Sequence, residues 1–167
     1  MIQPLPSTSP WLPLWTAPAQ DPSRKVDPLD WRRLLHGSAL LRDKRIVIVE
    51  DEGLTQIQLR KICLLAGMEV VGLATDGEQG VEQVLLTQPD MVLMDIKMPI
   101  LDGLNAAERI LQELSVCVVM LTAYDLDDYK AQAQAIGACG YVFKPVSASS
   151  LIPQLEAAYT VFQRKPA

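Results

Sequence analysis

The stretch VLMDIKMP, residues 92–99, places a carboxylate at the end of an apolar run. Val92, Leu93 and Met94 predict a strand buried on both faces, and Asp95 follows them directly. A surface turn accepts an aspartate at any position, whereas a buried strand that ends in Asp95 carries this side chain to the edge of a sheet. We therefore interpret Asp95 as part of a site, which the ends of other strands should share.

Strands and helices alternate around this stretch. Aliphatic runs predict the strands, and segments with apolar residues at helical spacing predict the helices between them. We expect strands at 45–50, 68–74, 90–95, 116–123 and 141–144, and helices at 54–65, 77–88, 104–114, 126–136 and 149–163. This order predicts an α/β fold of the (βα)5 type, with a doubly wound parallel five-stranded sheet and helices on both faces.

Two of the helices are predicted from particular residues. The apolar pattern of the first helix is carried by Leu54, Ile57, Ile62 and Leu65. The last helix is expected to start near Ser149, because Pro153 lacks an N–H group and is tolerated only within about the first helical turn.

Residues 1–43 differ in composition from the rest of the chain. Seven of the 12 prolines lie in residues 1–28, and all three tryptophans lie in residues 1–31. We expect a largely disordered N-terminal extension over 1–43, in which 28–36 could form a short helix, and a compact domain over 44–167. The apolar residues at 11–15 leave three interpretations open: contact with the domain, contact with a partner, or a translation start assigned too far upstream.

Charge and composition exclude several classes of partner. The net charge of −5 argues against direct binding of nucleic acid or of an anionic membrane. No apolar run approaches the roughly 20 residues of a spanning helix, and the N-terminus lacks a secretory signal pattern. Cys63, Cys117 and Cys139 lie among apolar or small residues, which predicts reduced thiols in a cytoplasmic protein. The single histidine, His36, is interpreted as a solvated surface residue.

Reactive side chains gather at the predicted strand ends. Glu50 and Asp51 end the first strand, Asp95 the third, Thr122 the fourth and Lys144 the fifth. Ligands of such sheets bind beyond the carboxyl ends of the strands, so we expect these residues to meet there. Oxygen ligands alone suit Mg²⁺, and a carboxylate beside a metal-bound phosphoryl group is placed as its nucleophile. Each residue alone could be a helix cap or a surface charge, but their coincidence favours a site.

Four motifs in this region resemble those of response regulator receiver domains in two-component systems. They are IVEDE (48–52), LMDIKMP (93–99), MLTAY (120–124) and GYVFKP (140–145), and the resemblance covers about 44–162. It implies a flavodoxin-like fold and a phosphorelay role in which Asp95 is the phosphoacceptor. It further implies that Mg²⁺ is held by Glu50, Asp51, Asp95 and the backbone carbonyl of Lys97.

The resemblance also implies roles after phosphorylation. Thr122 would be the switch hydroxyl, Tyr141 the aromatic side chain that responds to it, and Lys144 the lysine that binds the phosphoryl group. Lys97 and Tyr124 are predicted to shield the aspartyl phosphate from water and so to lengthen its lifetime. Glu50 stands where many relatives have Asp, which lengthens the reach to the metal.

The expected output is contact with another protein. The sequence is most similar in texture to receivers of RNA-binding antiterminator regulators, but only five residues follow Phe162, which favours a stand-alone receiver. A histidine kinase or phosphotransfer protein would phosphorylate it, and a protein effector would read the result, with the receiver a monomer or a weak phosphorylation-dependent dimer. A truncated antiterminator-type regulator and a phosphorylation-independent scaffold remain as alternatives. A phosphatase is disfavoured because Lys97 stands where a second Asp would be needed as general acid, so no further enzymatic activity is expected.

Overall fold

The computed structural model describes residues 38–124 and 127–165. The pattern at 28–36 and the apolar residues at 11–15 lie outside these residues, as does His36. Residues 38–43 form a turn that packs on the domain, with Leu41 fully buried.

Five parallel strands form one sheet in the order β2-β1-β3-β4-β5. The strands are β1 (Arg45–Val49), β2 (Glu69–Ala74), β3 (Met91–Asp95), β4 (Cys117–Thr122) and β5 (Gly140–Phe143). Their order changes direction after β1, which places β1 and β3 side by side in the middle. The predicted doubly wound (βα)5 fold is therefore confirmed.

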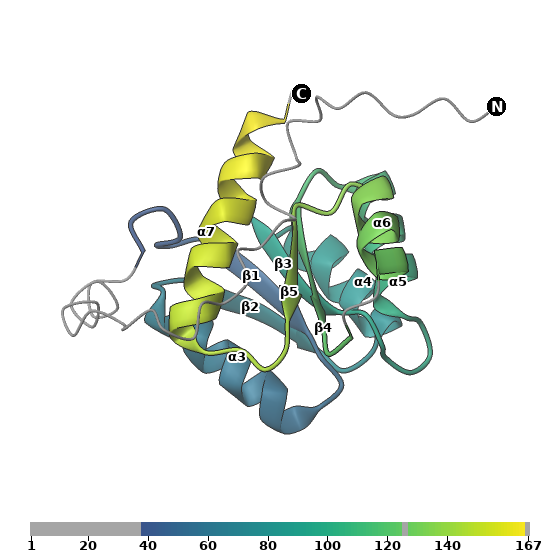
Figure 1. The fold of residues 1–167 in the computed structure, drawn as a ribbon, viewed down its shortest axis with the longest axis horizontal. Coiled ribbons are helices and arrows are strands. Elements are labelled where there is room, and N and C mark those ends of the chain that lie inside the picture. Colours follow the sequence, from purple (N-terminus) through teal and green to yellow (C-terminus); the bar gives the residue numbers. More distant parts are fainter. Residues whose placement is uncertain (1–37, 125–126, 166–167) are drawn as a thin grey trace.

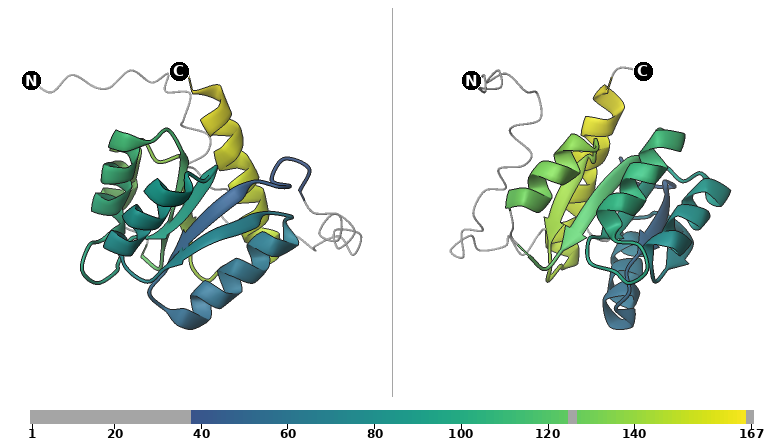
Figure 2. Two further views of the ribbon diagram at one scale, coloured as in Figure 1. Left: turned by 180° about the vertical axis from the view of Figure 1, so that it is seen from behind. Right: turned by 90° about the vertical axis from the view of Figure 1, so that its right-hand side faces the viewer.

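Helices cover both faces of this sheet (Figures 1 and 2). They are α3 (Gly53–Leu65), α4 (Gly77–Thr87), α5 (Gly103–Glu113), α6 (Asp127–Ala135) and α7 (Ala148–Arg164). Helices α3 and α7 pack on one face, whereas α4, α5 and α6 pack on the other. No helix within 38–124 and 127–165 is long and apolar enough to cross a bilayer.

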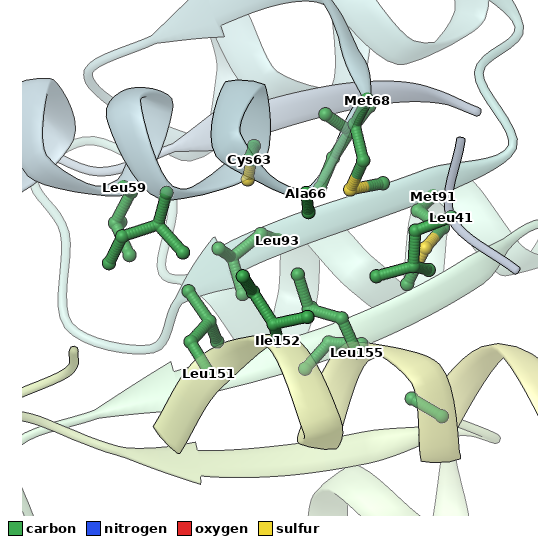
Figure 3. Close-up of a cluster of buried hydrophobic side chains, with 14 of the residues drawn as sticks. Leu41, Leu59, Cys63, Ala66, Met68, Met91, Leu93, Leu151, Ile152 and Leu155 are labelled. Atoms are coloured by element: carbon green, nitrogen blue, oxygen red, sulfur yellow. The ribbon is translucent and has the colours of Figure 1, made fainter. Parts of the chain in front are cut away.

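The alternation of side chains along each strand supplies both cores. In β1, Ile46 and Ile48 point into the cluster under α3 and α7, while Val47 and Val49 point into the cluster under α4 and α5. Figure 3 shows the first cluster, in which Leu59 and Cys63 of α3 face Leu93 of β3 and the side chains of α7. Because both faces are covered, the central strands are apolar up to the polar residues that end β3 and β4, as the sequence predicted.

The boundaries of the elements lie within one or two residues of those predicted. The side of α3 that is buried does not follow from its apolar pattern. Three of the four residues that carried the pattern, Leu54, Ile57 and Leu65, are exposed in the structure. The helix buries Leu59, Ile62 and Cys63. The predicted helix is therefore confirmed, but it is apolar on two sides, so helical spacing alone cannot identify the side that meets the sheet.

The last helix starts one residue before the predicted position. Ser147 is its N-cap and forms a capping box with Ser150, so α7 begins at Ala148. Pro153 is then the sixth helical residue, beyond the first turn where it was expected. The side-chain amide of Gln154 donates to the Ser150 carbonyl at 2.9 Å in this part of the helix.

Candidate functional site

The predicted site residues lie at one edge of the sheet. Asp95 is the last residue of β3 and Thr122 the last of β4, while Glu50 and Lys144 directly follow β1 and β5. These four strands are neighbours in the order β1-β3-β4-β5, so their carboxyl ends bring the side chains together. The backbone N–H of Lys144 donates to the Thr122 carbonyl at 2.8 Å, which extends the pairing of β4 and β5 into the site.

An ion-paired cluster forms the centre of the site. The Lys144 ammonium lies 2.7 Å from Glu50 Oε2 and 3.2 Å from Asp95 Oδ2. Glu50 and Asp95 are both buried, and the Lys144 side chain is only 16% exposed. One cation thus serves two buried carboxylates, which leaves the cluster with excess negative charge.

Burial shapes the protonation of this cluster. Removal from water raises the pKa of Asp95, and the nearby Lys144 opposes this rise. The pKa of Glu50 is raised by the same cause, again opposed by the hydrogen bond from Lys144. For Lys144, burial alone would lower the pKa, but the hydrogen bond that its ammonium donates to Glu50 and the charge of Asp95 raise it above its ordinary value. The ammonium is therefore held in its charged form at neutral pH.

The same edge can accommodate a metal ion. Glu50, Asp51 and Asp95 each offer a carboxylate oxygen, and these three atoms lie within 4.8 Å of one another. The set contains only oxygen, which suits a hard cation such as Mg²⁺, and the exposure of Asp51 leaves room for water ligands. The Glu52 N–H donates to Glu50 Oε1 at 3.2 Å and orients that side chain. The donor set therefore fits Mg²⁺, while a role for the Lys97 carbonyl stays a prediction.

Hydroxyl and aromatic side chains lie close together beside the ends of β4 and β5. The Thr122 hydroxyl oxygen accepts from the Tyr124 N–H at 3.1 Å, and the Tyr141 hydroxyl donates to the Tyr124 carbonyl at 3.4 Å. The Lys97 ammonium lies 4.0 Å from the centroid of the Tyr124 ring, within the range of a cation–π contact. The loops after β3 and β4 thus meet through the two residues that were predicted to shield the site.

Two supporting residues were not singled out from the sequence. Gly103 begins α5, and a Cβ atom there would lie 1.9 Å from the Asp95 carbonyl oxygen. Its N–H donates to the Ile96 carbonyl at 2.8 Å, so the backbone of α5 rests on the end of β3. The side-chain amide of Gln56 donates to the carbonyls of Glu50 and Ala74 at 3.2 and 2.9 Å and ties the ends of β1 and β2 together. The Asp102–Gly103 pair at the start of the predicted helix was the available signal for Gly103, whereas nothing in the sequence marks Gln56.

This geometry defines a class of protein: a flavodoxin-like domain with acidic residues, a hydroxyl and a lysine at the ends of its strands. Residues 46–156 match the response regulator receiver domain family. The chain belongs to this family, which acts in two-component signalling.

Individual relatives agree with the assignment. The chain is 41% identical over 120 residues to the transcriptional regulatory protein PdtaR of Mycobacterium tuberculosis, an alignment that covers 72% of this chain and 58% of PdtaR. It is 32% identical over 114 residues to the chemotaxis protein CheY of Treponema pallidum, covering 66% and 79%. The response regulator domain of CheB from Thermotoga maritima has a similar structure, with a TM-score of 0.66, 28% identity and coverage of 75% and 100%. The chain therefore spans somewhat more than half the length of PdtaR.

Proposed function

We propose that this receiver accepts a phosphoryl group on Asp95 and passes the signal on through protein contacts. The observation that carries the proposal is the position of Asp95, a buried carboxylate 3.2 Å from the Lys144 ammonium. It lies within a cluster of acids that can hold a divalent cation. Receiver domains in general are signalling modules that interact with histidine kinases or phosphotransfer proteins and with effectors.

In the transfer step, an Asp95 carboxylate oxygen would attack the phosphorus of a phosphohistidine. A P–O bond forms as the P–N bond breaks, and the imidazole leaves with the electron pair of that bond. Bound Mg²⁺ would offset negative charge on the phosphoryl oxygens. The Lys144 ammonium, held in place by Glu50, would stabilise the same oxygens electrostatically.

The Thr122 hydroxyl is proposed to respond to the phosphoryl group. In the structure it accepts from the Tyr124 N–H at 3.1 Å and donates a long hydrogen bond of 3.5 Å to the Tyr124 carbonyl, which a bond to a phosphoryl oxygen would replace. A shift of this hydroxyl toward Asp95 would alter the backbone of Tyr124, whose carbonyl accepts from Tyr141. A hydrogen bond made only in the phosphorylated state would supply the free-energy difference between the two states.

The partners are proposed from the family alone: a histidine kinase or phosphotransfer protein as the donor, and a protein effector as the target. The three cysteines are all buried and free, which fits the reducing cytoplasm where such exchanges would occur.

Phosphorylation can be tested with acetyl phosphate and Mg²⁺, followed by intact-protein mass spectrometry. The unmodified chain should gain one hydroxylamine-sensitive phosphoryl group, and Asp95→Asn should gain none. Asp102→Asn is the matched control, because Asp102 caps α5 outside the acidic cluster and Asn caps equally well. A chain that stays unphosphorylated under these conditions, and also with a phosphohistidine donor, would support the alternative of a phosphorylation-independent scaffold.

The switch can be tested by NMR. Thr122→Ala should still accept phosphate but lose the chemical-shift change at Tyr141 on addition of Mg²⁺ and a phosphate mimic. Thr122→Ser keeps the hydroxyl and should keep the change. Equal changes in all three proteins would show that the response does not pass through this hydroxyl.

A further inference from the structure

The outer side of α3 carries an apolar stripe that faces solvent. Its members, called the outer stripe here, are Leu54, Ile57, Leu64 and Leu65, which are 79%, 66%, 51% and 51% exposed. Their spacing of three, seven and one residues keeps them on one side of a helix with 100° per residue. The opposite side carries Leu59 and Cys63, which point into the core in Figure 3.

The exposed apolar side chains of the described residues are concentrated on α3. Of the nine large apolar side chains that are exposed within residues 38–124 and 127–165, four lie on α3. Single exposed apolar side chains are ordinary, whereas contiguous ones indicate a surface that binds something. A helix that needed only to cover the sheet would carry polar residues at these positions. The outer stripe is therefore expected to have an occupant.

The position of Ser38 points to the occupant. The Ser38 N–H donates to the Ala66 carbonyl at 3.1 Å, directly after α3, and the Ser38 hydroxyl donates to Glu156 of α7. The preceding 37 residues of the chain thus join the domain at the end of α3 where Leu64 and Leu65 lie. A helix of 13 residues is roughly 20 Å long, and about six extended residues cover that distance. The segment just before Ser38 is therefore long enough to follow the whole stripe.

The same segment has the apolar side chains that such a surface requires. Trp31, Leu34 and Leu35 follow one another at spacings of three and one residues, and Leu29 precedes them. Because the segment is part of the same chain, its effective concentration at the stripe is high, on the order of millimolar for a short connection.

We propose that residues 29–35 cover the outer stripe of α3 within the same chain, with Leu34 and Leu35 over its middle and Trp31 toward Leu54. The stripe ends at Leu54, three residues after Asp51. The covering segment would therefore lie beside the acidic edge of the sheet without contributing to the acidic cluster.

Tryptophan fluorescence of the full chain tests this directly, since all three tryptophans lie in residues 1–31 and the described domain has none. Replacing Trp11 and Trp15 by Phe leaves Trp31 as the only reporter. Its emission should lie at shorter wavelength, and its quenching by acrylamide should be weaker, than in the same chain unfolded in urea. Adding Ile57→Gln and Leu64→Gln should move both readings to the unfolded values while the circular dichroism of the domain is unchanged.

Leu86→Gln is the matched control, because Leu86 is 76% exposed but lies on α4, on the other face of the sheet. It should leave the emission of Trp31 unchanged. A solvated Trp31 in the folded chain would overturn the proposal, as would an emission that ignores the two α3 substitutions. An emission that changes on dilution, with a dimer in analytical ultracentrifugation, would instead assign the stripe to a second copy and would also overturn it.

Discussion

Replacement of Lys144 by Met tests the balance of charge in the acidic cluster. Lys144 is the only cation within ion-pair distance of Glu50 and Asp95 among the described residues, at 2.7 and 3.2 Å. Met keeps the length and apolar stem of the side chain but removes its charge. Two buried carboxylates would then face each other without a cation.

The expected cost is large because the pair is buried. Removing one partner of a buried ion pair costs roughly 3–5 kcal/mol of folding free energy, since the other charge stays buried without compensation. The pair of Arg109 and Glu78 provides the comparison, with a similar distance of 2.8 Å but side chains 53% and 52% exposed. Arg109→Met should cost no more than about 1 kcal/mol, because exposed pairs are screened by water.

The loss of stability in Lys144→Met should depend on pH in a definite direction. Burial raises the pKa of Glu50 and Asp95, and loss of Lys144 removes the group that opposes this rise. A carboxylate with a raised pKa destabilises the fold above that pKa, and the cost disappears as the pH falls through it. The free-energy difference between Lys144→Met and the unmodified protein should therefore be greatest at neutral pH and shrink toward acid.

Urea unfolding, followed by circular dichroism at several pH values with and without Mg²⁺, measures these effects. Mg²⁺ should restore part of the lost stability in Lys144→Met, and more than it adds to the unmodified protein, because it supplies the missing positive charge. A loss no larger than that of Arg109→Met would refute the reasoning. So would an equal effect of Mg²⁺ on both proteins.

Three further outcomes follow from the site. Asp51→Ala should abolish both Mg²⁺ binding, measured by calorimetry, and phosphoryl uptake, and uptake at the normal rate would contradict the metal assignment. Tyr124→Ala and Lys97→Asn should each speed the loss of phosphate from Asp95 in the presence of Mg²⁺, because the contact between these side chains would block water from the aspartyl phosphate. Unchanged rates of phosphate loss in both variants would contradict the shielding role. Gly103→Ala should lower the free energy of unfolding in urea by about 1–3 kcal/mol, because its Cβ would meet a backbone oxygen 1.9 Å away. Gly53→Ala is the control and should be tolerated, since its Cβ would meet nothing within 4 Å. Equal losses of stability in the two variants would show that the close approach at Gly103 is not limiting.

The meeting of the predicted site residues at one edge of the sheet could be predicted because topology converts sequence order into proximity. Glu50, Asp95, Thr122 and Lys144 are far apart in the chain, but each stands at the end of an apolar run. In a parallel sheet those ends meet at one edge. The pairing of one lysine with two carboxylates was not predictable, because it depends on the direction in which the Lys144 side chain leaves the end of β5. The contact of Lys97 with Tyr124 likewise requires the loops after β3 and β4 to close on each other.

The sequence alone predicted the alternation of strands and helices, the residues that meet at one edge of the sheet and the family to which the chain belongs. Hydrophobic period and strand-end chemistry are local properties, so they can be read from neighbouring residues. Only the tertiary structure decided which side of α3 is buried. Leu54 and Ile57 are as apolar as Leu59 and Ile62, and packing against the sheet and α7 selects the second pair. Which side of a helix is buried depends on the elements that pack against it, so the periodicity of one helix cannot predict it.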